Sequence, residues 1–147
     1  MASEDLKTTT RRAWDEAFHK GNVNALDEIV APDMVHHQPP GPDLKGLAAY
    51  KQMVADMRKA FSDIKFTFDE MIMEGEVSAA RWTFQGTHTG QMADMPPIPP
   101  TGKRVTMTGI ALVHTVNGKA VEMWQYPDML GFMQQLGVAP PMGKAGG

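Results

Sequence analysis

The dipeptide Asn117-Gly118 constrains the fold of this chain more than any other feature, because it separates two long runs of residues that favour β-structure. These runs cover residues 105–116 and 119–126. Asn-Gly suits the two central positions of a type I′ turn, both of which need a positive φ. The sequence therefore predicts an antiparallel hairpin in which Val116 pairs with Lys119.

The same turn predicts which side chains share a face of the sheet. Counting back from the turn places His114 opposite Val121 and Leu112 opposite Met123, all on one face. Trp124 then falls on the other face. We therefore expect His114 and Leu112 to lie together among apolar neighbours.

The remaining elements are predicted from the spacing of apolar residues along the chain. Spacing of three and four residues predicts a helix, and alternation predicts a strand with one buried face. On this basis the chain contains helices at residues 3–20, 26–30, 47–61 and 129–136, and strands at residues 34–38, 64–68 and 77–87. This order predicts an α+β domain, in which N-terminal helices cover the concave face of a curved antiparallel sheet and enclose a pocket.

Length and composition predict one compact domain. The chain has 147 residues, of which 42% are hydrophobic and 21% are charged, as is ordinary for a globular protein. We assign the domain to residues 1–138 and expect residues 139–147, rich in Gly and Pro, to form a flexible tail. The proline-rich loop at residues 89–100 could be a lid or an interface arm, and the role of its segment 92–100 stays open.

Charge and residue usage exclude several classes of partner. A net charge of −3 without a Lys/Arg stripe argues against nucleic acid and anionic membranes. The chain has neither a membrane-spanning apolar run nor an apolar signal core, so we expect a cytoplasmic protein. Cysteine is absent and the histidines lack the spacing of zinc ligands, so we expect no metal. An apolar small molecule is the expected partner.

Six short motifs follow one another along the second half of the chain. They are Phe84-Gln-Gly-Thr-His-Thr-Gly90, Pro100-Thr-Gly-Lys103, Gly109-Ile110, Asn117-Gly118-Lys119, Glu122-x-Trp124-x-x-x-Asp128 and Gln135-Leu-Gly137. Together they resemble the SnoaL-like polyketide cyclases, which have the nuclear-transport-factor-2-like (NTF2-like) fold. The resemblance implies a cone of curved antiparallel sheet and helices.

The resemblance also implies a chemistry, the ring-closing aldol condensation of a polyketide ester without metal or cofactor. The family's general acid/base aspartate matches Asp128, and a pocket histidine matches His114. A histidine of the family's early strand matches His37. Gln38 stands where the family commonly has an acidic residue, which argues against a second carboxylate from that strand.

Each of these positions also has a simpler structural explanation. Asp128 follows Pro127 and would serve equally as the N-cap of the last helix. His114 could be a buried histidine with satisfied hydrogen bonds instead of a group that orients a carbonyl. His36 and His37 are neighbours on a strand, so only one of them can line a pocket, and the sequence does not decide which.

An apolar ligand site is predicted to lie between the helices and the sheet. We place in the substrate site Trp14, Phe18, Met53, Met57, Trp82 and Leu112 together with His37, and His88 at the pocket mouth. Each apolar residue in this set could equally be plain core. Trp124 and Tyr126 lie on the predicted face opposite His114, where an aromatic surface favours a homodimer contact.

The sequence therefore predicts a cofactor-free cyclase for a small polyketide ester or a related carbonyl compound, with Asp128 as the base and His114 as a positioning donor. An isomerase or an epoxide hydrolase on the same fold is one alternative, although it would need a second convergent acid. A non-catalytic binding protein for an apolar small molecule is the other. Such a protein would be indifferent to Asp128→Asn.

Overall fold

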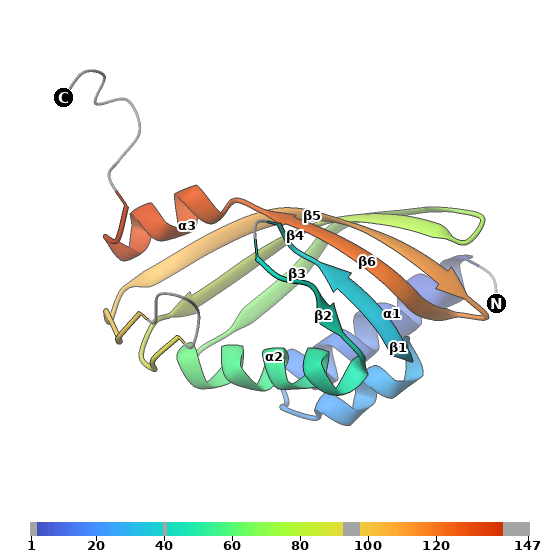
Figure 1. Ribbon diagram of the computed structural model, residues 1–147, viewed down its shortest axis with the longest axis horizontal. Coiled ribbons are helices and arrows are strands. Elements are labelled where there is room, and N and C mark those ends of the chain that lie inside the picture. The colour runs from blue at the N-terminus through green and yellow to red at the C-terminus, as the bar shows by residue number, and fades with distance from the viewer. Residues whose placement is uncertain (1–2, 40, 93–97, 140–147) are drawn as a thin grey trace, which may run out of the picture.

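The computed structural model shown in Figure 1 describes residues 3–39, 41–92 and 98–139. Helices and strands follow in the order α1 (Ser3–Phe18), the 3-10 helix η1 (Val23–Glu28), β1 (Val30–His37), β2 (Leu44–Lys45), α2 (Leu47–Ala60), β3 (Lys65–Glu74), β4 (Val77–Thr87), β5 (Arg104–Val116), β6 (Lys119–Pro127) and α3 (Met129–Leu136). The predicted α+β class is confirmed. None of the helices among these residues is long and apolar enough to cross a bilayer.

The strands form one curved sheet in the order β2-β1-β6-β5-β4-β3. Neighbouring strands from β3 to β6 are antiparallel, as the alternating pattern predicted. The pairing of β1 with β6 is parallel, so the expectation of a wholly antiparallel sheet is wrong at that edge. Among the described strands β2 and β3 are the two edges, and the sheet is therefore open.

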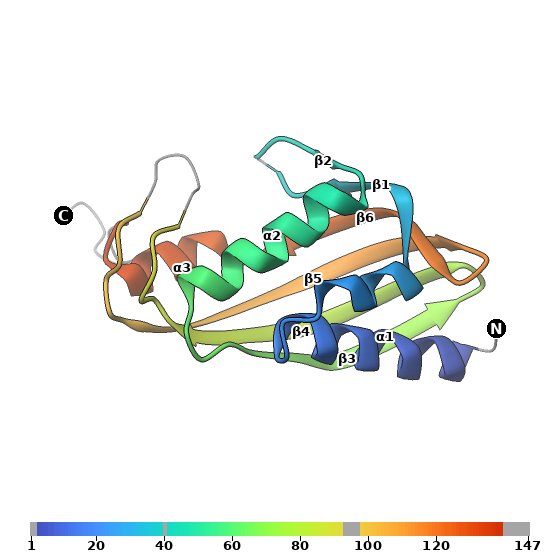
Figure 2. The same cartoon turned by 90° about the horizontal axis from the view of Figure 1, so that it is seen from below.

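Helices α1 and α2 lie across the same face of the sheet, as Figure 2 shows from below. The aromatic residues of α1 anchor this arrangement, because the rings of Trp14 and Phe18 lie 5.5 and 5.1 Å from the ring of Phe66 on β3. Helix α3 covers the far end of the sheet, where buried Phe132 packs 6.0 Å from Phe61. The concave face thus carries helices at both ends.

The β5–β6 hairpin contains a β-bulge that the sequence did not reveal. The turn is as predicted, with positive φ at Asn117 and Gly118 and with Val116 paired to Lys119. The register then shifts, so that His114 pairs with Glu122. The additional residue on β6 changes the pairing beyond it. Each side chain of β5 there shares its face of the sheet with a different set of β6 side chains than the turn alone would predict.

This shift corrects the predicted positions of two residues. Leu112 pairs with Trp124 and Val113 with Met123, so His114 and Leu112 share the outer, convex face of the sheet with Trp124. The predicted pairs of His114 with Val121 and of Leu112 with Met123 are therefore wrong.

Part of the proline-rich loop and most of the C-terminal tail fall outside the described residues. These are residues 93–97 and 140–147. On either side of the first gap, the backbones of Met92 and Ile98 are hydrogen-bonded to each other, and both side chains are buried. The lid, the interface arm, the tail and the domain boundary at residue 138 all stay predictions.

Candidate functional site

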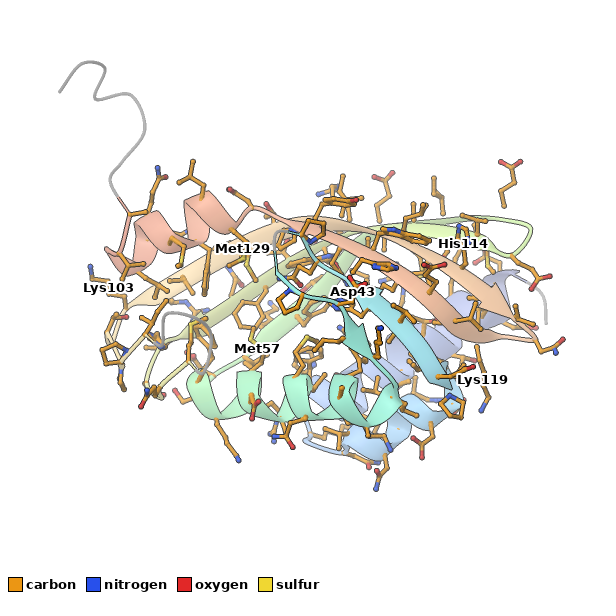
Figure 3. All side chains as sticks on the ribbon, viewed as in Figure 1. Asp43, Met57, Lys103, His114, Lys119 and Met129 are labelled. Carbon is orange, nitrogen blue, oxygen red and sulfur yellow. The ribbon has the colours of Figure 1, made fainter. Side chains whose placement is uncertain are left out.

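A cavity of about 550 Å³ lies between the concave face of the sheet and helices α1, α2 and α3. Its walls are mainly apolar and aromatic, which is typical of sites for small organic molecules. The residues that line it include five of those placed in the pocket from sequence, Trp14, Phe18, Met53, Met57 and Trp82. In Figure 3, Met57 points from α2 toward the sheet. Their role in binding a ligand stays a prediction.

His36, and not His37, is the histidine of β1 that lines the cavity. Its side chain lies on the same face of the strand as that of Met34, and both residues are buried. Burial, and next the neighbouring His37, lower the pKa of His36 to about 4, although Asp43 acts in the opposite direction. The His36 ring is therefore neutral at pH 7.

The neutral ring of His36 is available to a ligand. It packs against Tyr50 with ring centroids 5.3 Å apart. Within the described part of the chain no hydrogen bond is made by its ring nitrogens. A neutral imidazole offers one donor and one acceptor, so His36 could bind either a carbonyl or a hydroxyl group in the cavity.

His37 points to the outer face, where it ties three segments of the chain together. Its Nδ1 lies 2.8 Å from Asp43 and its Nε2 lies 2.7 Å from Glu122 on β6. Its ring stacks on Trp124 at 5.2 Å. Hydrogen bonds to Glu122 and then to Asp43 raise the pKa of His37. The assignment of His37 to the substrate site is therefore wrong in its geometry.

Gln125 is a polar residue of the cavity wall that sequence reasoning missed. It is 8% exposed, and its Oε1 accepts a hydrogen bond of 3.0 Å from Nε1 of Trp82. Gln125 alternates with buried Met123 on β6, and this spacing is the signal that could have placed it in the cavity wall. Tyr50 of α2 also lines the cavity, and its regular helical spacing gave no sign of more than a core role.

Asp128 begins helix α3. Its Oδ1 accepts a 2.9 Å hydrogen bond from the backbone N–H of Gly131, which confirms the simpler N-cap assignment. Its side chain is exposed and does not line the cavity, whereas its neighbours Pro127 and Met129 do. Asp128 therefore sits beside the cavity rim, and its role as acid/base stays a prediction.

Two other predicted site residues lie on the outer face of the sheet, away from the cavity. His114 is exposed on the outer face with its ring 5.0 Å from that of Trp124, and Leu112 is 40% exposed on the same face. Figure 3 shows His114 on the side of the sheet opposite α2. Both side chains alternate with those of buried Ala111 and Thr115 on β5, and the bulge in β6 places Met123, their predicted neighbour, on the inner face.

His88 is fully buried and does not guard the pocket mouth. Its Nδ1 lies 3.0 Å from Oγ1 of Thr101, and its ring packs 5.4 Å from that of Phe61. Burial lowers the pKa of His88, and the Gly90 backbone acts in the opposite direction. Together with its backbone hydrogen bonds to Gly102 and Lys103, His88 fixes how the segment before β5 lies against the end of β4. Across the described ranges, no group of three or more His, Asp or Glu side chains is arranged to hold a metal ion.

Comparison with known proteins bears on the family and on the fold. Residues 8–136 match the family described as SnoaL-like polyketide cyclase. Aklanonic acid methyl ester cyclase DauD of Streptomyces sp. strain C5 is 30% identical over 133 residues, which are 86% of this chain and 78% of that protein. Nogalonic acid methyl ester cyclase of Streptomyces nogalater is 29% identical over 124 residues, which are 82% of this chain and 90% of that protein.

A solved structure has the same arrangement of elements. TsrD from Streptomyces laurentii superposes with a TM-score of 0.83 at 23% identity, over 94% of this chain and 98% of that one. At this identity the likeness bears on the fold alone.

Proposed function

Because the chain belongs to the SnoaL-like polyketide cyclase family, we propose that it closes a ring in a polyketide methyl ester by acid/base chemistry and without a cofactor. The match over residues 8–136 confirms the family predicted from the sequence motifs, and the likeness to TsrD confirms the predicted NTF2-like fold. One observation carries the proposal within the family. It is the aromatic-walled cavity of about 550 Å³, which is large enough for a polycyclic ligand.

The proposed reaction is an intramolecular aldol addition. A base removes a proton from the carbon next to a carbonyl group, and the resulting enolate carbon bonds to a second carbonyl carbon. The oxygen of that second carbonyl then takes up a proton. Substrate and product have the same atoms, so the step requires no oxidant, reductant or co-reactant, and one group can remove and return the proton.

Asp128 is the proposed acid/base group. Its Oδ1 is used by the helix cap, and we propose that its other oxygen reaches a ligand that fills the cavity as far as Pro127 and Met129. We propose that His36 orients one carbonyl from inside the cavity in place of His114, because His36 is neutral and without a hydrogen bond to the described residues. His36 lies on β1, and Asp128 follows the end of the adjacent strand β6.

Turnover of two esters tests this proposal. The purified protein is incubated with aklanonic acid methyl ester or nogalonic acid methyl ester, the compounds named for the relatives' activities. The product is followed by chromatography and absorbance, since its mass equals that of the substrate. Asp128→Asn should abolish turnover while it keeps the helix cap. Asp56→Asn changes a carboxylate of α2 that lines the cavity and is the matched control.

A binding protein for an apolar metabolite is the second candidate function. It is favoured by the exposed position of Asp128 as a helix cap and by the distance of His114 from the cavity wall. If the protein binds either ester without converting it, and Asp128→Asn binds it equally well, the binding function replaces the catalytic one.

We also propose that the protein forms a homodimer through the outer face of its sheet. This face carries exposed apolar side chains on four strands, namely Ile72, Val77, Ile110, Leu112, Val116 and Tyr126. Contiguous apolar surface of this kind is typical of a protein interface. A second copy of the chain is the partner that offers the same surface in return.

A further inference from the structure

The cavity wall contains a buried hydrogen-bond donor that the described residues leave unused. Nε1 of Trp14 is buried and has no hydrogen-bond partner among them. Trp14 as a whole is 6% exposed and lines the cavity. Buried N–H groups are almost always paired in folded proteins, so an exception needs an explanation.

Two further donors of the same wall have only a weak acceptor. Oη of Tyr50 lies 3.8 Å from Sδ of Met123, and Nε2 of Gln125 lies 3.4 Å from the same atom. A thioether sulfur accepts hydrogen bonds poorly. Burial raises the pKa of Tyr50, so its phenol keeps the proton and remains a donor.

The orientation of the Gln125 amide is fixed by Trp82. The indole N–H of Trp82 can only donate, so the group that faces it at 3.0 Å is the amide oxygen. The NH₂ group must therefore point to the other side, where Met123 takes up at most part of its capacity. Trp82 thus acts as a positioning residue that presents a donor.

These donors belong to one region of the wall. The rings of Trp14 and Tyr50 are 5.8 Å apart, and Tyr50 and Gln125 converge on the sulfur of Met123. All three donor residues line the cavity. Among the described residues, these N–H and O–H groups are in hydrogen-bond contact with no acceptor stronger than the sulfur of Met123.

We propose that Trp14, Tyr50 and Gln125 form a donor site that binds an acceptor oxygen of an aromatic ligand, such as a ring ketone or a quinone carbonyl. The inference rests on the proposed function for the assignment of that ligand to the polyketides. In a ring-closing reaction the same donors would stabilise the oxygen on which charge collects when the α proton is removed.

A water molecule is the competing recipient of these hydrogen bonds. A second cavity of about 70 Å³ lies between α1 and the sheet, and Trp14 and Gln125 line it as well. If water in that smaller cavity were the recipient, removal of a donor would change the stability of the protein and leave the choice of ligand unaltered.

A pair of ligands that differ in one oxygen tests the proposal. 9-Fluorenone and fluorene have the same tricyclic skeleton, and only the former has a carbonyl group. We expect the protein to bind 9-fluorenone more tightly than fluorene in a calorimetric or fluorescence titration. Trp14→Phe and Tyr50→Phe each remove a donor and keep a ring. Each should weaken 9-fluorenone binding about fivefold more than fluorene binding, which is the usual effect of one hydrogen bond.

The matched control is Trp124→Phe, the same chemical change on the outer face of the sheet. It should leave the ratio of the two affinities as in the unchanged protein. A variant that only loses packing would bind both ligands more weakly, and the ratio of its affinities for 9-fluorenone and fluorene would stay the same. An unchanged ratio in both cavity variants, or no preference for 9-fluorenone in the unchanged protein, would overturn the proposal.

The experiment separates this inference from the proposed function. If the ratio falls in Trp14→Phe and Tyr50→Phe but neither methyl ester is converted, the donor site stands and the cyclase activity fails. If the esters are converted equally well by the unchanged protein and by both variants, the cyclase activity stands and the donor site fails.

Discussion

The imidazole of His37 lies 2.7 Å from the carboxylate of Glu122, so side chains as well as backbone join the parallel strands β1 and β6. The other ring nitrogen lies 2.8 Å from Asp43, which precedes β2. Both acidic partners favour the charged imidazolium. The edge of the sheet next to the cavity rim is therefore held by a charge that depends on pH.

His37→Gln should destabilise the protein in weak acid more than in base. The pKa of His37 is raised in the folded state, so the stabilisation is fully present below the pKa of the unfolded chain, which is about 6.5. It is lost as the pH rises through the raised pKa. Urea denaturation of both proteins at about pH 5 and about pH 9 measures this difference. An equal loss at both pH values would show that the charge is not involved.

His36 should show the opposite dependence on pH. Its folded pKa is lowered to about 4, so the unfolded chain takes up a proton near its ordinary pKa while the folded chain does not. Stability should therefore fall as the pH drops from about 6.5 toward 4, and His36→Asn should flatten that decline. An NMR titration of the imidazole signals measures the pKa of His36 and the pKa of His37 in one experiment. Protonation of His36 near its ordinary pKa would contradict its burial.

The sequence predicted local structure well where one physical signal dominated. The strand Val77–Thr87 and the helix Met129–Leu136 have the predicted bounds. Alternation of apolar residues marks the strand, and Asp128 together with Gly137, whose φ is 81°, marks the two ends of the helix. These signals act over a few residues and need no knowledge of the rest of the fold.

The site was predicted less well because it depends on long-range pairing. One bulged residue, Val121, changes which side chains of β6 share a face with His114, and nothing in the local pattern marks it. As a result, Met123 and Gln125 face inward while His114 lies on the outer face beside Trp124. The choice between His36 and His37 depends on the parallel pairing of β1 with a strand that lies far away in the sequence. By contrast, Trp14 and Phe18 were placed correctly because a helix has only one apolar face.

Gly109 allows the close approach of β5 to the cavity wall. A Cβ at this position would overlap the indole of Trp82 and lie 2.9 Å from Cα of Pro127. Gly109→Ala should therefore cost about 1–3 kcal/mol in the free energy of unfolding and disturb the Trp82–Gln125 hydrogen bond. Denaturation with near-UV circular dichroism measures both effects. Thr108→Ala, an exposed change at the next residue, should cost less than about 0.5 kcal/mol.

Asp128 has a cap role that can be separated from its proposed chemistry. Asp128→Ala removes the acceptor for the Gly131 N–H and should cost about 1 kcal/mol in the free energy of unfolding. Asp128→Asn retains an acceptor oxygen and should cost much less. If both variants lose ester turnover but only the alanine variant loses stability, the carboxylate has a role beyond the cap. If Asp128→Asn converted the ester as fast as the unchanged protein, the role of Asp128 would be limited to the helix cap.

The outer face of the sheet should lose its proposed dimer contact when a charge is placed at its centre. Leu112 is 40% exposed and lies between Ile110 and His114 on β5, so Leu112→Lys would bury a charge against the same face of a second copy. Size-exclusion chromatography with light scattering should show a dimer for the unchanged protein and a monomer for the variant.

Leu130→Lys is the matched control for that experiment, because Leu130 is an exposed leucine of α3 rather than of the sheet. It should leave the dimer intact, since its added charge stays in solvent. If Leu112→Lys alone becomes monomeric and keeps its cavity ligand affinity, the two faces of the sheet have separate roles, with binding on the concave side and association on the convex side. A monomeric unchanged protein would rule out the contact.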